Sequence, residues 1–361
     1  MKVSGKLGLV LSGGGAKGAY QVGIIKYMSE IGMQPDMVSG TSIGALNASV
    51  ICASRDIEVA ATALDEIWKE LANTSPIQIG GKNNISSVGL LMNFIPGAKL
   101  NPIINAVDIL RKGADFAKDA YAKYSDEYKN SSSYKSSLER RDQGILNSEP
   151  LVDLLNNYAP TEKLKTGLPF YISVYESRGS SRDLVDYMNQ SLLGNETRNS
   201  EFWHVQSLEE ETMQDAIMAS AALPLLFQAR AINGTSYRDG GMGGAFNQQG
   251  NTPVQPLVDN GCSHVVVSLL EDGSSFNRHN FPSASIIEVR PKEFISDSAL
   301  DMIAFNPDKI NYWMEQGYLD AKRCIGNVKT AMEGLSFNKE TAKERDSVIN
   351  QLESDGFNIT S

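Results

Sequence analysis

The pentapeptide Gly40-Thr41-Ser42-Ile43-Gly44 has the residue types and spacing of a nucleophile elbow. In such an elbow, small residues allow a sharp turn between a strand and a helix, and the turn lifts the serine hydroxyl out of the sheet. A chain with 31 glycines can contain this pattern by chance, so its surroundings decide its meaning. A strand-like segment precedes the pentapeptide and a helix-like segment follows it. This context favours Ser42 as the nucleophile of an acyl transfer.

A glycine loop, Gly13-Gly14-Gly15-Ala16-Lys17-Gly18, lies one strand and one helix earlier. Glycines at a strand-to-helix turn let a ligand approach the backbone, and the free N–H groups there favour an anion. A dinucleotide site needs an acidic residue at the end of the second strand, where the sequence has the elbow instead. A P-loop needs a Ser or Thr after its lysine, and none follows Lys17. The loop fits better as a source of oxyanion N–H donors, with Gly13, Gly14 and Gly15 as candidates.

A serine nucleophile also requires a base. In the order of an α/β-hydrolase triad the histidine comes last, so His264 and His279 are the candidates among the three histidines, but neither has a motif around it. The other candidate is Asp239, which precedes Gly240-Gly241. An Asp-Gly pair is common in ordinary turns. A carboxylate in a desolvated site can also accept a serine proton, so Asp239 is kept beside the histidines as a candidate base.

Strands and helices alternate in the segments that must position these residues. Up to residue 75, we expect strands at 7–11 and 36–38 and helices at 20–31, 43–52 and 57–71. The alternation resumes near residue 150, where the expected helices are 150–155, 212–222 and 311–328 and the expected strands are 168–175, 229–232, 263–270 and 285–289. Such alternation predicts an α/β fold with a parallel sheet covered by helices.

Residues 76–148 interrupt this alternation. Apolar residues at helical spacing are followed by a polar, tyrosine-containing stretch, which predicts a helical insertion over the core. We expect a single domain over residues 1–336 that contains this insertion, followed by a polar tail over 337–361. The tail is charged and is expected to be a surface helix.

Composition excludes several function classes. The formal net charge of -10 is poorly suited to binding a nucleic-acid polymer. Three scattered cysteines predict neither a disulfide framework nor a zinc site, and a reducing cytoplasm fits them best. Neither a signal peptide nor an apolar run of membrane-spanning length is visible. We therefore expect a cytoplasmic protein that reaches membranes from solution.

Taken together and in this order, the glycine loop, the Ser42 elbow and Asp239-Gly240-Gly241 resemble the patatin-like phospholipases. The segments 219–227, 251–253 and 316–318 are similar to that family as well. The resemblance implies a three-layer α/β/α fold with a central, mostly parallel sheet between helices. It also implies hydrolysis of membrane-lipid acyl esters by a dyad of Ser42 and Asp239, with no cofactor and no metal.

The resemblance gives roles to further residues. Gly13, Gly14 and Gly15 would form the oxyanion hole, and Lys17 would hold the loop or a lipid phosphate. Gly40, Gly44, Gly240 and Gly241 would support the two catalytic turns. The partners implied are membrane phospholipids as substrate, at the inner face of a membrane. Bacterial relatives include secreted toxins and antiphage effectors switched on by cyclic nucleotides, so regulation as a membrane-degrading effector in antiviral defence, with a cyclic nucleotide or a protein as activator, is kept open. A homo-oligomer is kept open as well.

Two alternatives from other function classes remain. One is a soluble esterase or thioesterase with a histidine-containing triad. The other is a nucleotide-binding sensor that has kept the loops without hydrolase activity.

Overall fold

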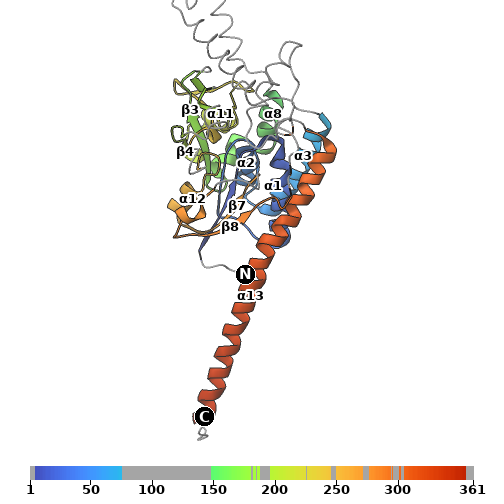
Figure 1. The fold of residues 1–361 in the computed structure, drawn as a ribbon, viewed down its shortest axis with the longest axis vertical. Coiled ribbons are helices and arrows are strands. Elements are labelled where there is room, and N and C mark those ends of the chain that lie inside the picture. Colours follow the sequence, from blue (N-terminus) through green and yellow to red (C-terminus); the bar gives the residue numbers. More distant parts are fainter. Residues whose placement is uncertain are drawn as a thin grey trace, which may run out of the picture.

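The computed structural model describes the chain between residues 5 and 354 (Figure 1). The stretches outside this description are 75–147, 180–181, 184, 188–195, 225, 245–248, 271–275, 294, 296–300 and 302–304. The predicted helical insertion at 76–148 therefore lies almost wholly outside the described residues.

A mixed sheet forms the middle of the described part, with the strand order β5-β6-β3-β2-β1-β7-β8 and with β4 also paired to β3. Its strands are β1 (Lys6–Leu11), β2 (Met37–Gly40), β3 (Phe170–Glu176), β4 (Glu201–His204), β5 (Arg230–Ile232), β6 (Thr235–Asp239), β7 (Cys262–Ser268) and β8 (Ser285–Val289). The run β3-β2-β1-β7-β8 is parallel, whereas β4, β5 and β6 join through antiparallel pairs. The predicted mostly parallel sheet is confirmed.

Apolar residues cover both faces of this sheet. On β1, Leu9 and Leu11 belong to one hydrophobic core, while Val10 between them belongs to a second core on the opposite face. This alternation follows from the two-residue period of a strand. The helices of the first face are α1 (Ala19–Glu30), α2 (Ile43–Ser54), α3 (Ile57–Thr74), α8 (Glu149–Tyr158), α9 (Thr161–Thr166), α11 (Glu210–Ser220) and the start of α13 (Pro307–Ser354); the short α12 (Gln255–Asp259) lies on the second. A sheet flanked by helices is thus confirmed.

The register of the strands brings the chemical motifs together at the carboxyl ends of the central parallel strands. Leu11 pairs with Gly40, so the glycine loop after β1 and the elbow after β2 leave the sheet side by side. Gly40 pairs with Ile172 of β3, and Asp239 pairs with Val174 two residues further along the same strand. Because β6 runs antiparallel to β3, Asp239 at the end of β6 lies near Gly40 at the end of β2.

Helix α13 is much longer than the expected helix at 311–328 and includes most of the polar tail. The expected end at Val328 is wrong, because the Glu-, Lys- and Ala-containing residues beyond it favour a helix without needing a core to pack on. The first half of α13 packs against α1 at a close crossing, where a Cβ on Gly23 would lie 1.9 Å from the Met314 carbonyl oxygen. In Figure 1 the second half extends away from the sheet and the other helices.

Candidate active site

Ser42 lies at the tip of a strained turn between β2 and α2. Its backbone has φ 56° and ψ −129°, a conformation that costs a non-glycine residue on the order of 1–3 kcal/mol. The turn is possible because its glycines have no Cβ, so other backbone atoms can come into contact with them. A Cβ on Gly40 would lie 2.4 Å from the Gly44 carbonyl oxygen, and a Cβ on Gly44 would lie 2.0 Å from that of Leu11. The predicted elbow is therefore present, and both flanking glycines are sterically required.

The end of α11 holds both Ser42 and Asp239. The Ser42 N–H donates to the carbonyl oxygen of Ser220 at 3.1 Å and to its hydroxyl oxygen at 3.2 Å. Two residues further on, the carbonyl oxygen of Ala222 accepts the Asp239 N–H at 3.2 Å. One turn of backbone thus fixes the relative positions of the serine and the aspartate.

Asp239 is a buried carboxylate beside Ser42. Its side chain is inside the protein, with the residue 2% exposed, and Oδ1 accepts the Gly241 N–H at 2.8 Å. Oδ2 makes no hydrogen bond of good geometry to a described residue, yet the Ser42 hydroxyl is close enough to act on the carboxylate. Burial raises the pKa of Asp239 to about 7, while the Ser42 hydroxyl and the Gly241 N–H oppose the rise. Near neutral pH this carboxylate can therefore exchange a proton.

Gly240 allows Asp239 to approach the sheet. A Cβ on Gly240 would lie 2.3 Å from the Ser173 carbonyl oxygen and 2.4 Å from its hydroxyl oxygen. Backbone that close cannot give way, so only glycine fits directly after Asp239. Asp239 also caps the following turn, η3 (Gly240–Met242), through its bond from Gly241.

The glycine loop lies against the nucleophile. A Cβ on Gly13 would meet the Cβ of Ser42 at 2.9 Å, so the loop backbone and the serine side chain are in contact. The Gly13 N–H donates to Oδ1 of Asn251 at 3.2 Å. In contrast, the N–H groups of Gly14 and Gly15 make no hydrogen bond to another residue that the structure describes. Of the three predicted donors, Gly14 and Gly15 remain available, and Gly13 is already engaged.

A chain of hydrogen bonds between buried side chains supports the start of this loop. The indole N–H of Trp68 donates to Oδ1 of Asn47 at 2.9 Å, and Nδ2 of Asn47 donates to Oε1 of Gln21 at 2.8 Å. Nε2 of Gln21 then donates to the Ser12 carbonyl oxygen at 2.7 Å, directly before Gly13. The sequence did not predict this chain of hydrogen bonds. Its only signal was the presence of Gln21 and Asn47 among the buried residues of these two helices.

Lys17 is buried in the short turn η1 (Gly15–Gly18), with 3% of its surface exposed. Its side chain therefore lies within the protein. This placement favours a role in holding the loop over contact with a lipid phosphate.

The three histidines lie elsewhere. His264 pairs with Leu7 in β1. Leu7 lies four residues, or roughly 13 Å along the strand, before Leu11, which pairs with Gly40 at the end where the site lies. His204 stacks on Tyr171, and His279 belongs to the exposed turn η4 (Arg278–Asn280). No histidine hydrogen-bonds to Ser42 or Asp239 within the described part.

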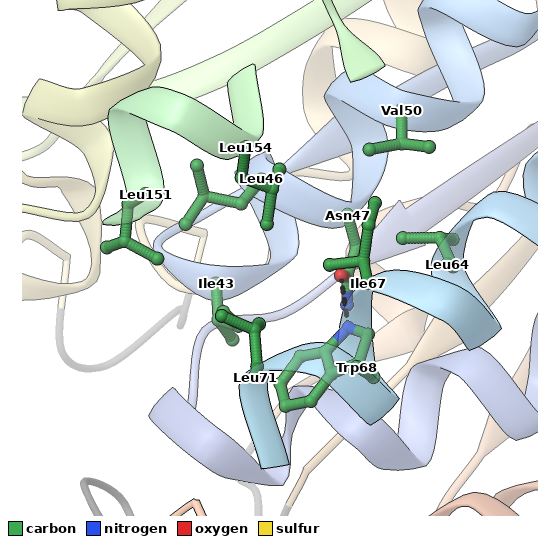
Figure 2. A pocket seen from close by; sticks show the side chains of 10 residues that line it. All are labelled: Ile43, Leu46, Asn47, Val50, Leu64, Ile67, Trp68, Leu71, Leu151 and Leu154. Atoms are coloured by element: carbon green, nitrogen blue, oxygen red, sulfur yellow. Dashed lines mark hydrogen bonds between the residues drawn. The ribbon is translucent and has the colours of Figure 1, made fainter. Parts of the chain in front are cut away.

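A small apolar pocket lies beside the elbow, between α2, α3 and α8 (Figure 2). Ile43, which directly follows Ser42 in the chain, is one of its lining residues. Asn47 is the amide among otherwise apolar and aromatic walls. The lining residues are Ile43, Leu46, Asn47, Val50, Leu64, Ile67, Trp68, Leu71, Leu151 and Leu154.

The sheet and the site define an α/β protein with a serine on an elbow and a buried carboxylate beside it. A family model for patatin-like phospholipases matches residues 9–257, well over half of the chain. The chain belongs to the patatin-like phospholipase family.

Individual relatives match more narrowly. The neuropathy target esterase sws of Drosophila melanogaster is 51% identical over 51 residues, which are 14% of this chain and 4% of that protein. The same protein of Drosophila persimilis matches with the same identity over the same length. The chain thus corresponds to only a small part of the length of these curated relatives.

Two solved structures of bacterial proteins show a distant likeness. VipD from Legionella pneumophila has a TM-score of 0.39 and 14% identity, covering 89% of this chain and 67% of that one. The type III effector protein ExoU of Pseudomonas aeruginosa has a TM-score of 0.33 and 15% identity, covering 88% of this chain and 52% of that one.

Two features are absent from the described residues. None of the helices there has the length and hydropathy needed to cross a membrane. No group of three or more His, Cys, Asp or Glu side chains in that part of the chain is placed to hold a metal ion.

Proposed function

We propose that this protein is a serine carboxylic-ester hydrolase that cleaves fatty-acyl esters of membrane phospholipids, with Ser42 as nucleophile and Asp239 as base. The observation that carries the proposal is the pairing of a strained elbow serine with a fully buried carboxylate whose pKa is raised to about 7. A general base works best when its pKa lies near the working pH. Asp239 meets that condition without a histidine.

In the first half of the reaction, Asp239 accepts the proton of the Ser42 hydroxyl as the serine oxygen attacks the acyl carbonyl carbon. The carbonyl oxygen becomes an oxyanion, which the free N–H groups of Gly14 and Gly15 stabilise. Each such donor is worth on the order of 100-fold in rate. The tetrahedral intermediate then collapses, the C–O bond to the lysophospholipid breaks, and Asp239 returns the proton to the leaving oxygen.

In the second half, a water molecule replaces the lysophospholipid. Asp239 accepts a proton from this water as its oxygen attacks the acyl carbon of the acyl-Ser42 ester. The second tetrahedral intermediate uses the same N–H donors. Its collapse releases the fatty acid and restores the Ser42 hydroxyl with the proton held by Asp239, so the dyad returns to its starting state.

Membrane phospholipid is the substrate class that the surroundings favour. The small pocket that begins at Ile43 has mostly apolar walls, which favours an apolar acyl group near Ser42 over a polar one that would lose hydration there. The family is described as phospholipases, and its relative with a local match carries the name of an esterase. The site is proposed to act at a membrane surface reached from solution.

The alternative of a histidine triad has no support in the geometry. A serine, a histidine and a carboxylate in a triad lie within hydrogen-bond reach of one another. His264 pairs with Leu7, about 13 Å by the strand spacing from the end of β1 at Leu11, where the site lies. The exposed His279 has no hydrogen bond to Asp239.

The test uses vesicles of mixed phosphatidylethanolamine and phosphatidylglycerol, with products identified by mass spectrometry. We expect the wild-type protein to release free fatty acid and lysophospholipid in equal amounts, and Ser42→Ala to release neither. The double variant His264→Gln/His279→Gln is expected to match the wild type. Equal product from the wild type and Ser42→Ala would remove the enzyme claim, and loss of activity in the histidine variant would remove the dyad.

A further inference from the structure

The 250–253 segment crosses the ends of β1 and β2, from which the glycine loop and the elbow begin. It makes a hydrogen bond with each of four residues there. Thr41 Oγ1 donates to the Gly250 carbonyl oxygen at 2.8 Å, Gly13 N–H donates to Asn251 Oδ1 at 3.2 Å, the hydroxyls of Ser12 and Thr252 lie 3.0 Å apart, and Ser39 Oγ donates to the Pro253 carbonyl oxygen at 2.6 Å. The bonds of Gly13 and Thr41 therefore hold the two site-forming turns in a fixed relation, whereas the bond of Ser39 joins the segment to β2.

Asn251 is the member of this segment that contacts the oxyanion loop itself. Its Oδ1 accepts the Gly13 N–H, and its Nδ2 lies 3.5 Å from the Gly13 carbonyl oxygen, so the side-chain amide spans both sides of one residue. The same Oδ1 atom faces Gly241, where an added Cβ would lie 3.0 Å away. Gly241 in turn donates its N–H to Asp239. Asn251 thus lies between the glycine loop and the turn that carries the carboxylate.

This contact decides which backbone donors are available. A peptide N–H that is bonded to a side-chain oxygen cannot also give its full strength to a transient oxyanion. With Gly13 engaged, the N–H groups of Gly14 and Gly15 are the two in this glycine triplet without a hydrogen-bond partner among the described residues. Glycine backbone is the most mobile of any residue type, so three successive glycines need an external contact to hold one orientation.

We propose that Asn251 is a positioning residue, which engages Gly13 so that Gly14 and Gly15 present their N–H groups to the oxyanion at Ser42. This inference rests on the proposed hydrolytic function. It assigns Gly13 to the support of the oxyanion hole. The stabilisation is realised only when the oxyanion forms, so its loss lowers kcat and leaves KM nearly unchanged.

The experiment compares Asn251→Ala with Ser39→Ala, a matched control. Ser39→Ala also removes one bond to the 250–253 segment, but at a buried site that does not touch Gly13. Rates are measured with p-nitrophenyl butyrate, and inactivation with a fluorophosphonate, whose tetrahedral adduct needs the same N–H donors. For Asn251→Ala we expect kcat and the inactivation rate to fall together by about 10- to 100-fold, with KM within about threefold of the wild type.

For Ser39→Ala we expect a loss of thermal stability similar to that of Asn251→Ala, but a kcat within about threefold of the wild type. If Asn251→Ala does not fold, Asn251→Ser gives the same test, since a short hydroxyl at this half-buried position cannot reach Gly13. A kcat within threefold of the wild type in the folded Asn251 variant, or equal losses in both variants, would overturn the inference. Ser42→Ala separates the two claims: without a wild-type rate that depends on Ser42, the hydrolytic function itself fails.

Discussion

The backbone N–H of Ser42 donates to two oxygen atoms of Ser220, the carbonyl at 3.1 Å and the hydroxyl at 3.2 Å. Ser42 has a positive φ, which is unfavourable for a residue with a side chain, so the turn persists only while its surroundings hold it. Ser220 supplies that restraint from the end of α11. The same turn reaches Asp239 through the Ala222 carbonyl oxygen, so any movement of α11 reaches both proposed catalytic residues.

Removing the Ser220 hydroxyl should therefore reduce activity without removing it. Ser220→Ala deletes one of the two acceptors, and a buried hydrogen bond is worth about 1 kcal/mol, so we expect kcat to fall roughly 5-fold. The matched control is Ser49→Ala, which deletes another buried serine hydroxyl in α2 that donates to the Leu46 carbonyl oxygen. Steady-state ester hydrolysis of both variants decides the matter. A loss of kcat in Ser49→Ala as large as that in Ser220→Ala would show a general effect of stability.

The pH dependence of turnover should report the ionisation of Asp239. Only the ionised carboxylate can accept the serine proton, so kcat should rise with pH and level off above the Asp239 pKa of about 7. Well below that pH the slope should be about tenfold per pH unit. A variant with all three histidines changed to Gln should keep the same curve. A rising limb that disappears in this variant would assign the titration to a histidine.

Folding stability should depend on the same group. The Asp239 pKa is raised from 3.8 to about 7 in the folded protein, so between these values the folded state binds more protons than the unfolded state. Its contribution to the free energy of unfolding is therefore lost as pH rises through that window. A shift of about three pH units corresponds to roughly 4 kcal/mol, so Asp239→Asn should be more stable than the wild type at pH 8 and similar at pH 4.

Urea unfolding at several pH values measures this difference. Ser42→Ala provides a second comparison, because it removes a hydroxyl that lowers the Asp239 pKa. The loss of stability with rising pH should then extend to higher pH than in the wild type. Parallel curves for the wild type and Asp239→Asn across this range would show that Asp239 has an ordinary pKa.

Two glycine-to-alanine changes should have very different effects. In Gly44→Ala the new Cβ would lie 2.0 Å from a backbone oxygen, so we expect the free energy of unfolding to fall by more than about 3 kcal/mol and activity to be lost. In Gly326→Ala, on α13, the nearest atom is the hydroxyl of the Tyr27 side chain at 2.8 Å. That side chain can move, and alanine favours the helix by about 1 kcal/mol, so the change should be small. Similar losses in both would contradict the steric account of the elbow.

The sequence predicted the parallel half of the fold well because each element there carries a local signal. The strands β1 and β7 each contain an apolar run, at 9–11 and 265–267, α1 is buried along most of its length, and α3 places its apolar residues on one face. The strands β4 and β6 were missed. Both are short, partly exposed and antiparallel, and β6 ends in Arg238-Asp239, so their pairing depends on partners far away in the chain.

The candidate site shows the same division between local and distant information. Ser42, the glycine loop and Asp239 are recognisable because each lies in a short motif with small residues. The contacts made by Ser220 and Asn251 were not foreseen, since each joins residues 178 or 238 positions apart. The occupation of the Gly13 N–H could not be foreseen either, because it depends on where the Asn251 side chain points.

The most direct measurement is the initial rate of fatty-acid release from phospholipid vesicles at pH 8 by Asp239→Asn, beside the wild type and Ser42→Ala. Asparagine keeps the size and shape of the side chain but cannot accept the serine proton. With folding of each variant verified by circular dichroism, we expect Asp239→Asn to fall at least about 1,000-fold, to the level of Ser42→Ala. A folded Asp239→Asn protein that keeps more than a tenth of the wild-type rate would contradict the Ser42–Asp239 dyad.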